Sequence, residues 1–223
     1  MSIYREEAID SLIEALKRKE FAICQTIALE TLCSLSGRLP SLGKPLTEAW
    51  LLKTAGFDQP YKTLMLGDKI AMLEDDPLEI LARSSDCLLK FFLLFIHIVT
   101  SDDLYYFEIS SQEEEEKAMT AWEKRLAFVL CNHDNGAIFK ALEECFSSNS
   151  VGMAKSCLII ATWLTFMLTK IPDTGMRTIA SQCLLDQFIN VLQSSRNLEE
   201  KILAALALNS FFYDPGDFNL DLV

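Results

Sequence analysis

The sequence predicts an all-α protein built as an armadillo/HEAT-like α-solenoid, a superhelix of stacked helices. A helical pair recurs three times, at residues 8–35, 137–166 and 184–212. In each copy an amphipathic helix is followed by a short polar break and a more apolar helix rich in Ala, Leu and Ile. Half of the 223 residues are hydrophobic. That share fits inner helices that are buried on more than one side.

Turn and cap residues define the helices of the first half. Gly37 ends the first pair, and Gly56 ends a short helix for which Thr47 is the expected N-cap. Asp76-Pro77 supplies an N-cap and a first-turn proline for a long helix. Residues 57–76 are expected to be irregular, with one helical turn near 61–66. The helices are therefore expected at 2–17, 20–36, 47–53 and 77–100.

The second half shows equally clear boundaries. Ser111 to Glu114 has the spacing of a capping box, Asn135-Gly136 predicts a turn, and Pro172-Asp173 breaks the chain. Asn197 is the expected N-cap of the last helix, with Glu200 three residues later, and Asp214-Pro215-Gly216 is expected to end it. Loops are expected at 37–46 and 101–112. The helices are expected to start near 113, 137, 151, 174 and 198 and to end near 131, 146, 170, 193 and 212.

The spacing of the pairs predicts how many repeats the chain holds. When Leu32, Leu164 and Phe211 are aligned, the steps between them are 132 and 47 residues. Armadillo and HEAT units run about 40–47 residues, and 132 is three units of 44. The spacing therefore predicts two divergent units between the first and second pairs, built on the helices at 77–100 and 113–131.

Charge and composition exclude several classes of partner. The net charge is −12, and residues 71–135 carry 5 basic and 14 acidic groups, a net of −9. A nucleic-acid partner or an anionic membrane surface requires a basic patch, so neither is expected. The apolar runs at 87–99 and 157–168 are too short to cross a bilayer. Seven cysteines without a CxxC motif predict reduced thiols in the nucleus or cytoplasm.

No residue pattern predicts catalysis, a cofactor or a metal site. The acidic run 113–116 could bind a cation, but acidic residues at a helix start are also favoured by the helix dipole. Cys131 and His133 are close in sequence, yet no third group is indicated, and a buried thiol beside a surface imidazole is the favoured interpretation. Phosphate-binding glycine loops and zinc-ligand spacing are absent from the sequence.

A surface therefore remains as the candidate functional feature. In armadillo-type units one helix of each repeat lines a concave face, and here these would be the helices at 20–36, 151–170 and 197–212. Their least apolar positions are the candidate protein-binding residues, although each could equally be an ordinary solvated side chain. The six candidates are Gln25, Glu30, Lys155, Thr162, Lys201 and Asn209.

Several long strings resemble one plant family. They are YREEAIDSLIEALKRKEF, SLSGRLPSLGKPLTEAWLLKTAGFD, WEKRLAFVLCNHDNGAIFKALEECF, AKSCLIIATWLTFML and Ile171-Pro-Asp-Thr-Gly175. These strings are similar to the armadillo-like region of the LIN (Lumpy infections, or Cerberus) proteins, which are U-box E3 ubiquitin ligases with C-terminal WD40 repeats. The resemblance implies ubiquitin transfer to a protein substrate and a link to rhizobial infection and nodulation.

The chain also departs from that family in its domain content. Residues 1–215 are expected to form the armadillo-like region and 216–223 a tail, with no U-box and no WD40 blade, since none of the three tryptophans forms a WD dipeptide. No catalytic residue can therefore be carried over, and a free-standing interaction scaffold is the alternative. Terminal helices without polar caps predict exposed stacking faces that meet flanking domains or a second copy.

Overall fold

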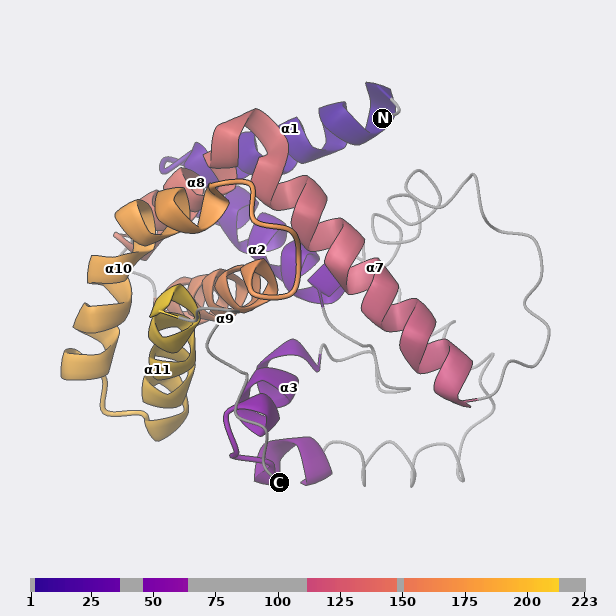
Figure 1. Cartoon of the computed structure of the whole chain (residues 1–223). Helices are drawn as coiled ribbons and strands as arrows, with labels where there is room; N and C mark the ends of the chain where they lie inside the picture. Colours follow the sequence, from indigo (N-terminus) through magenta and orange to yellow (C-terminus); the bar gives the residue numbers. More distant parts are fainter. Residues whose placement is uncertain (1–2, 37–45, 64–111, 148–150, 213–223) are drawn as a thin grey trace, which may run out of the picture.

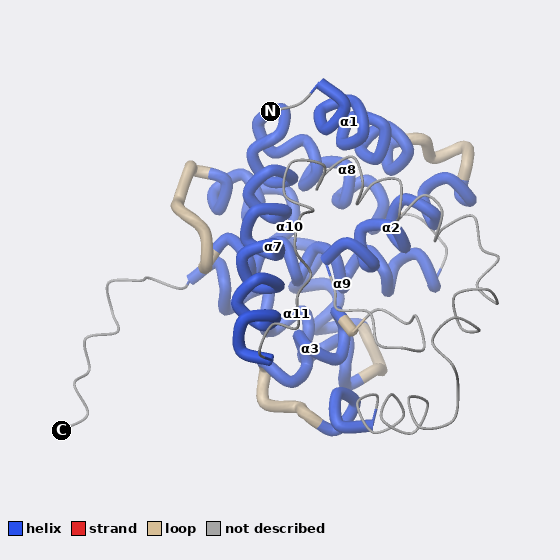
Figure 2. The backbone as a smooth tube through the Cα atoms, turned by 90° about the vertical axis from the view of Figure 1, so that its right-hand side faces the viewer, coloured by secondary structure: helices blue, strands red, loops and turns tan. Residues whose placement is uncertain are grey.

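The described part of the chain is helical throughout. The computed structural model describes residues 3–36, 46–63, 112–147 and 151–212, and every regular element within them is a helix (Figure 2). The elements are α1 (Ile3–Lys17), α2 (Ala22–Ser36), α3 (Thr47–Thr54), α7 (Gln112–Asn132), the 3-10 helix η1 (His133–Gly136), α8 (Ala137–Phe146), α9 (Val151–Leu168), α10 (Met176–Ser194) and α11 (Leu198–Phe212).

The three predicted helical pairs are confirmed as α1–α2, α8–α9 and α10–α11, and they stack in that order. Helix α8 packs between α1 and α10 in an outer layer, and α2, α9 and α11 form an inner layer (Figure 1). Neighbouring α9 and α11 run in the same direction, since Lys155 lies near Glu199 while Thr162 lies beside Leu203, further along both helices. This is the arrangement of an all-α, ARM-like solenoid.

The predicted pair of intervening units is wrong. The first pair packs directly on the second: His133 Nε2 lies 2.6 Å from Asp10 Oδ1, and the Cys145 thiol donates to the Leu16 carbonyl at 3.3 Å. Helix α2 likewise packs on α9. The 132-residue step therefore does not count repeats that are stacked between these two pairs. The helix expected at 77–100 lies outside the described residues.

Helix α9 forms the centre of the core. Its neighbours are α2 and α11 in the same layer, α8 and α10 in the outer layer, and α3 and α7 on the remaining side (Figure 1). Two contacts hold these crossing helices: the Trp122 indole donates to the Leu35 carbonyl, and Trp50 meets Phe166 edge to face. All residues from 157 to 165 are buried. The side of α9 that was expected to line a concave face is therefore covered.

Two cap predictions had different outcomes. Thr47 is not the N-cap of α3; its hydroxyl donates to the Cys33 carbonyl at 2.9 Å and thereby joins α3 to the end of α2. Asn197 does cap α11, because its Oδ1 accepts the Glu199 N–H at 2.9 Å. Glu200 does not bond the N-cap N–H directly. Ser195 lies between them, accepting from Asn197 and donating to the Glu200 carboxylate.

The remaining boundaries follow the sequence closely. The turn at Asn135-Gly136 is confirmed and joins α7 to α8. Residues 59–63 are helical, which begins slightly before the expected turn at 61–66. The break at Pro172-Asp173 separates α9 from α10, as expected. The residues outside the described ranges include Ser111, Asp76-Pro77, the loop at 37–45 and the expected end at 214–216.

Candidate functional site

The thiol and imidazole at the end of α7 do not form a nucleophile and base. Cys131 is fully buried, and burial raises the pKa of its thiol far above the ordinary value. His133 Nε2 is instead bonded to the Asp10 carboxylate of α1. A reactive cysteine needs a lowered pKa, so the structure supports the structural interpretation. In the described ranges, no three His, Cys, Asp or Glu side chains gather as metal ligands do.

Two of the six candidate binding residues are inside the protein, and their assignment to a binding face is wrong. Gln25 is 1% exposed and donates from Nε2 to the Leu16 carbonyl at 2.6 Å, which satisfies an acceptor in the last turn of α1. Thr162 is fully buried, and its hydroxyl lies 3.4 Å from the Leu203 carbonyl of α11. Both polar groups bond buried backbone carbonyls, which explains their presence in apolar helices.

Lys155 is at the surface but is engaged by its own chain. Its Nζ lies 2.9 Å from Glu48 Oε1 of α3, with the lysine side chain 38% exposed. The hydrogen bond to Glu48 is the main cause that raises the pKa of Lys155, and the charges of Glu48, Glu199 and Glu200 act in the same direction. Lys155 therefore connects α9 to α3 and to the start of α11.

The other three candidates lie on two separate helix faces. Glu30 is exposed on α2, Asn209 is exposed on α11, and Lys201 is partly exposed on α11. Helix α9, covered by α3 and α7, lies between these two helices. The six residues therefore do not form one binding face. Lys201 and Asn209 remain together, because residues eight apart lie within about 80° on a helix of 3.6 residues per turn.

Two exposed stripes replace the predicted concave face. We define the α2 stripe as Ile23, Thr26, Ile27 and Glu30, and the α11 stripe as Leu198, Lys201, Ala205, Asn209 and Phe212. The large apolar side chains of both stripes are highly exposed to solvent: Ile23 is 76% exposed, Leu198 62% and Phe212 77%. The lack of polar caps predicted exposed stacking faces at the terminal helices. The individual apolar residues were not among the candidates, because only polar positions were selected.

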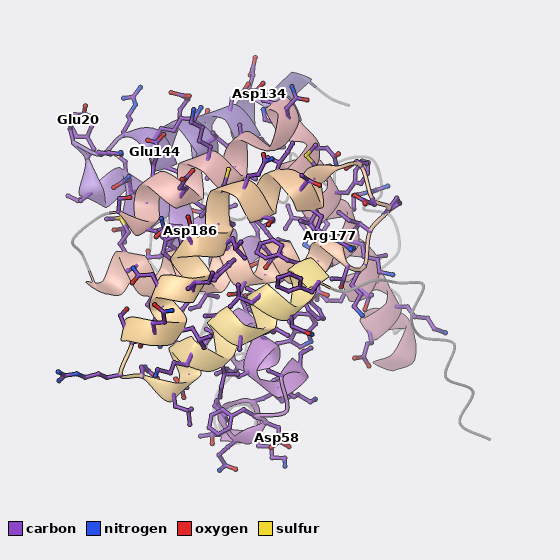
Figure 3. The ribbon with its side chains drawn as sticks, turned by 60° about the vertical axis from the view of Figure 1, so that its left-hand side comes forward. Glu20, Asp58, Asp134, Glu144, Arg177 and Asp186 are labelled. Carbon is purple, nitrogen blue, oxygen red and sulfur yellow. The ribbon has the colours of Figure 1, made fainter. Side chains whose placement is uncertain are left out.

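The outer layer has a different surface. Its helices expose charged and polar side chains, including Glu144 of α8 and Asp186 of α10 (Figure 3). Lys19 Nζ lies 3.6 Å from Glu144 Oε2, and both side chains are solvated. An exposed pair of this kind contributes only about 0–1 kcal/mol. The outer layer therefore has the character of an ordinary solvated face, and the stripes are the stronger candidates for contact.

The fold defines a helical-repeat domain, a class of protein that acts through the surfaces its stacked helices expose. A profile of the family described as "Putative E3 ubiquitin-protein ligase LIN, ARM-like domain" matches residues 1–80 and 96–222. The chain belongs to this family, as the resemblance of its strings predicted.

Curated relatives in two legumes agree with this assignment. The chain is 51% identical over 216 residues to "Putative E3 ubiquitin-protein ligase LIN-1" of Lotus japonicus and 50% identical over 215 residues to "Putative E3 ubiquitin-protein ligase LIN" of Medicago truncatula. These matches cover 97% and 96% of this chain but 12% of each relative. No solved structure matches the chain. In the described part of the chain, none of the helices has the length and apolarity to cross a membrane.

Proposed function

We propose that this chain is the protein-interaction module of a LIN-type E3 ubiquitin ligase and that it positions a protein substrate for ubiquitin transfer. The observation that carries the proposal is the family match over nearly the whole chain, combined with exposed apolar stripes. The ubiquitin-transfer module would lie in another part of the ligase. The family resemblance implies a role in rhizobial infection and nodulation, which we include in the proposal. The cysteines in the described part of the chain are free thiols and most are buried, which supports a reducing compartment, the cytoplasm or nucleus.

The α11 stripe is the proposed substrate-contacting surface. It keeps two of the candidate residues, Lys201 and Asn209, between two open apolar side chains, Leu198 and Phe212. A surface that combines exposed apolar side chains with polar positions is common in protein interfaces, and aromatic residues such as Phe212 are enriched there. Glu30 lies on the opposite end of the inner layer, and Lys155 is bonded to Glu48, so these two are less suited to this contact.

The test separates ligase chemistry from substrate choice. With E1, E2, ubiquitin and ATP, we expect these 223 residues alone to form no ubiquitin conjugates. In root cells that express a ligase containing this segment, we expect the α11 stripe variant Lys201→Glu/Asn209→Lys to reduce the set of ubiquitinated proteins as deletion of the segment does. The variant Asn190→Lys on the outer helix α10 is the matched control.

Two results would contradict this proposal. Conjugates formed by the 223 residues alone would place ligase chemistry within the chain. A ubiquitinated set unchanged by deletion would favour the alternative, a free-standing scaffold without a ubiquitin-related role.

A further inference from the structure

The two ends of the inner layer each lack a neighbouring helix. Helix α9 has α2 on one side and α11 on the other, whereas α2 and α11 each have a neighbour in this layer on one side only. Helix α1 packs on the outer side of α2, and helices α7 and α3 pack on its inner side. On α11 the corresponding sides are taken by α10 and α3. The α2 stripe and the α11 stripe therefore face away from α9, at opposite ends of the stack.

The packing of the inner helices shows which kind of partner can cover the free end of the inner layer. The inner helices pack side by side twice, α2 against α9 and α9 against α11, each with its outer partner behind it. A further helical pair of the same kind would continue this packing at either end. A second copy of the chain supplies such a pair at both ends, with no new type of contact.

The two stripes also match in character. The α2 stripe has Ile23 at 76% and Ile27 at 45% exposure, while the α11 stripe has Leu198 at 62%. The α2 stripe carries one charge, the acid Glu30, and the α11 stripe carries one charge of the opposite sign, Lys201. Contact between the two stripes therefore buries apolar surface without opposing like charges.

We propose that copies of this chain stack head to tail, with the α11 stripe of one copy on the α2 stripe of the next. The contact is heterologous, because two different surfaces meet, and so it can repeat along a row of copies. Thr26 and Asn209 make both stripes partly polar, so we expect association to be weak and to appear only at high concentration. The proposal does not rest on the ubiquitin-related function, although both use the α11 stripe: in a row of copies, the last copy leaves this stripe free for a substrate. Ile23→Glu blocks stacking through the α2 stripe alone and leaves the α11 stripe intact, so it separates the two roles.

Sedimentation velocity over a concentration series tests the proposal. For the unmodified chain, we expect the average mass to rise with concentration. Ile23→Glu on α2 and Ala205→Glu on α11 each place a charge in one stripe, and each should weaken association at least about 10-fold. Both positions are exposed, so folding should be retained, as circular dichroism checks. Gln182→Glu on the outer face of α10 is the control and should associate as the unmodified chain does.

Mixing the two variants gives the decisive result. Each variant keeps one intact stripe, so an equimolar mixture should form dimers that do not grow further. The reversed pair Glu30→Lys/Lys201→Glu should associate again, whereas each of its single changes should weaken association. A monomer at every concentration, association of either stripe variant on its own as tight as that of the unmodified chain, or a mixture without dimers would each overturn the proposal. The first result would assign the stripes to another occupant, such as a flanking part of a longer chain.

Discussion

At the residue scale, polar groups were the hardest feature to predict. The sequence identified Asn197 as a cap because the cap bond is local, joining residues two positions apart. It could not identify Gln25, Thr47 or Thr162 as structural, since their partners are carbonyls 9, 14 and 41 positions away. A polar residue in an apolar helix has two interpretations, a surface contact or a buried hydrogen bond. Only the packing of the helices decides between them.

The turn between α7 and α8 gives a residue-scale prediction. Asp134, Asn135 and Gly136 all have positive φ, and a Cβ added at Gly136 would lie 3.1 Å from Phe139 and 3.3 Å from Ile179. Gly136→Ala adds this crowding to the strain of φ +80°, so the free energy of unfolding should fall by about 2–3 kcal/mol. Denaturant unfolding measures the change.

Gly175 provides the matched control for that substitution. Its φ is +82°, but a Cβ there would meet nothing within 4 Å. Gly175→Ala should therefore show the strain alone, about 1 kcal/mol. Equal losses for the two variants would show that crowding at the α7–α8 turn has no effect on stability.

At the element scale, helix existence was predictable and helix neighbours were not. Apolar periodicity and turn residues placed every described helix within a few residues, because both are local properties. The composition of α9 showed that it was buried on several sides but not by which helices. Its covering by α3 and α7 brings together segments far apart in sequence, including Trp50 and Phe166. Because α3 and α7 cover α9, this helix does not line the expected concave face.

The attachment of α3 gives an element-scale prediction. Lys155→Met removes the bond to Glu48 and leaves Glu48 Oε1, which is buried, without its cation. Because Lys155 is 38% exposed, solvent screening limits the loss of stability to about 1 kcal/mol. Hydrogen exchange should increase in α3 more than in α10. The variant Lys201→Met on α11 is the control. An increase of exchange in α3 that is equal in the two variants would contradict the predicted role of Lys155.

At the scale of the whole molecule, the buried thiols predict alkaline sensitivity. Burial raises the pKa of Cys33 to about 12 and of Cys145 to about 11, and it also raises the pKa of Cys131 and Cys157. The unfolded chain releases these protons near the ordinary pKa of 9.0, while the folded chain retains them. Stability is therefore unaffected below pH 9 and falls above it, by about 1.4 kcal/mol per pH unit for each thiol.

Denaturant unfolding under reducing conditions at pH 8, 9, 10 and 10.5 measures this dependence. Cys157→Ala should lower stability at pH 8 because it leaves a cavity, and it should also make the fall above pH 9 shallower. A free energy of unfolding that stays constant from pH 8 to pH 10.5 would show that the thiols are open to solvent.

The long separation in sequence between the first two pairs is expected to affect the order in which the core assembles. Helices α8 to α11 lie within residues 137–212 and contact one another over short sequence distances. Helices α1 and α2 join them only after residues 37–136 have closed into a loop, at an entropic cost on the order of 4 kcal/mol. Contacts that close long loops form late, so the C-terminal pairs are the expected nucleus and the N-terminal pair docks last. We therefore expect the first helices of the sequence to be the last to fold.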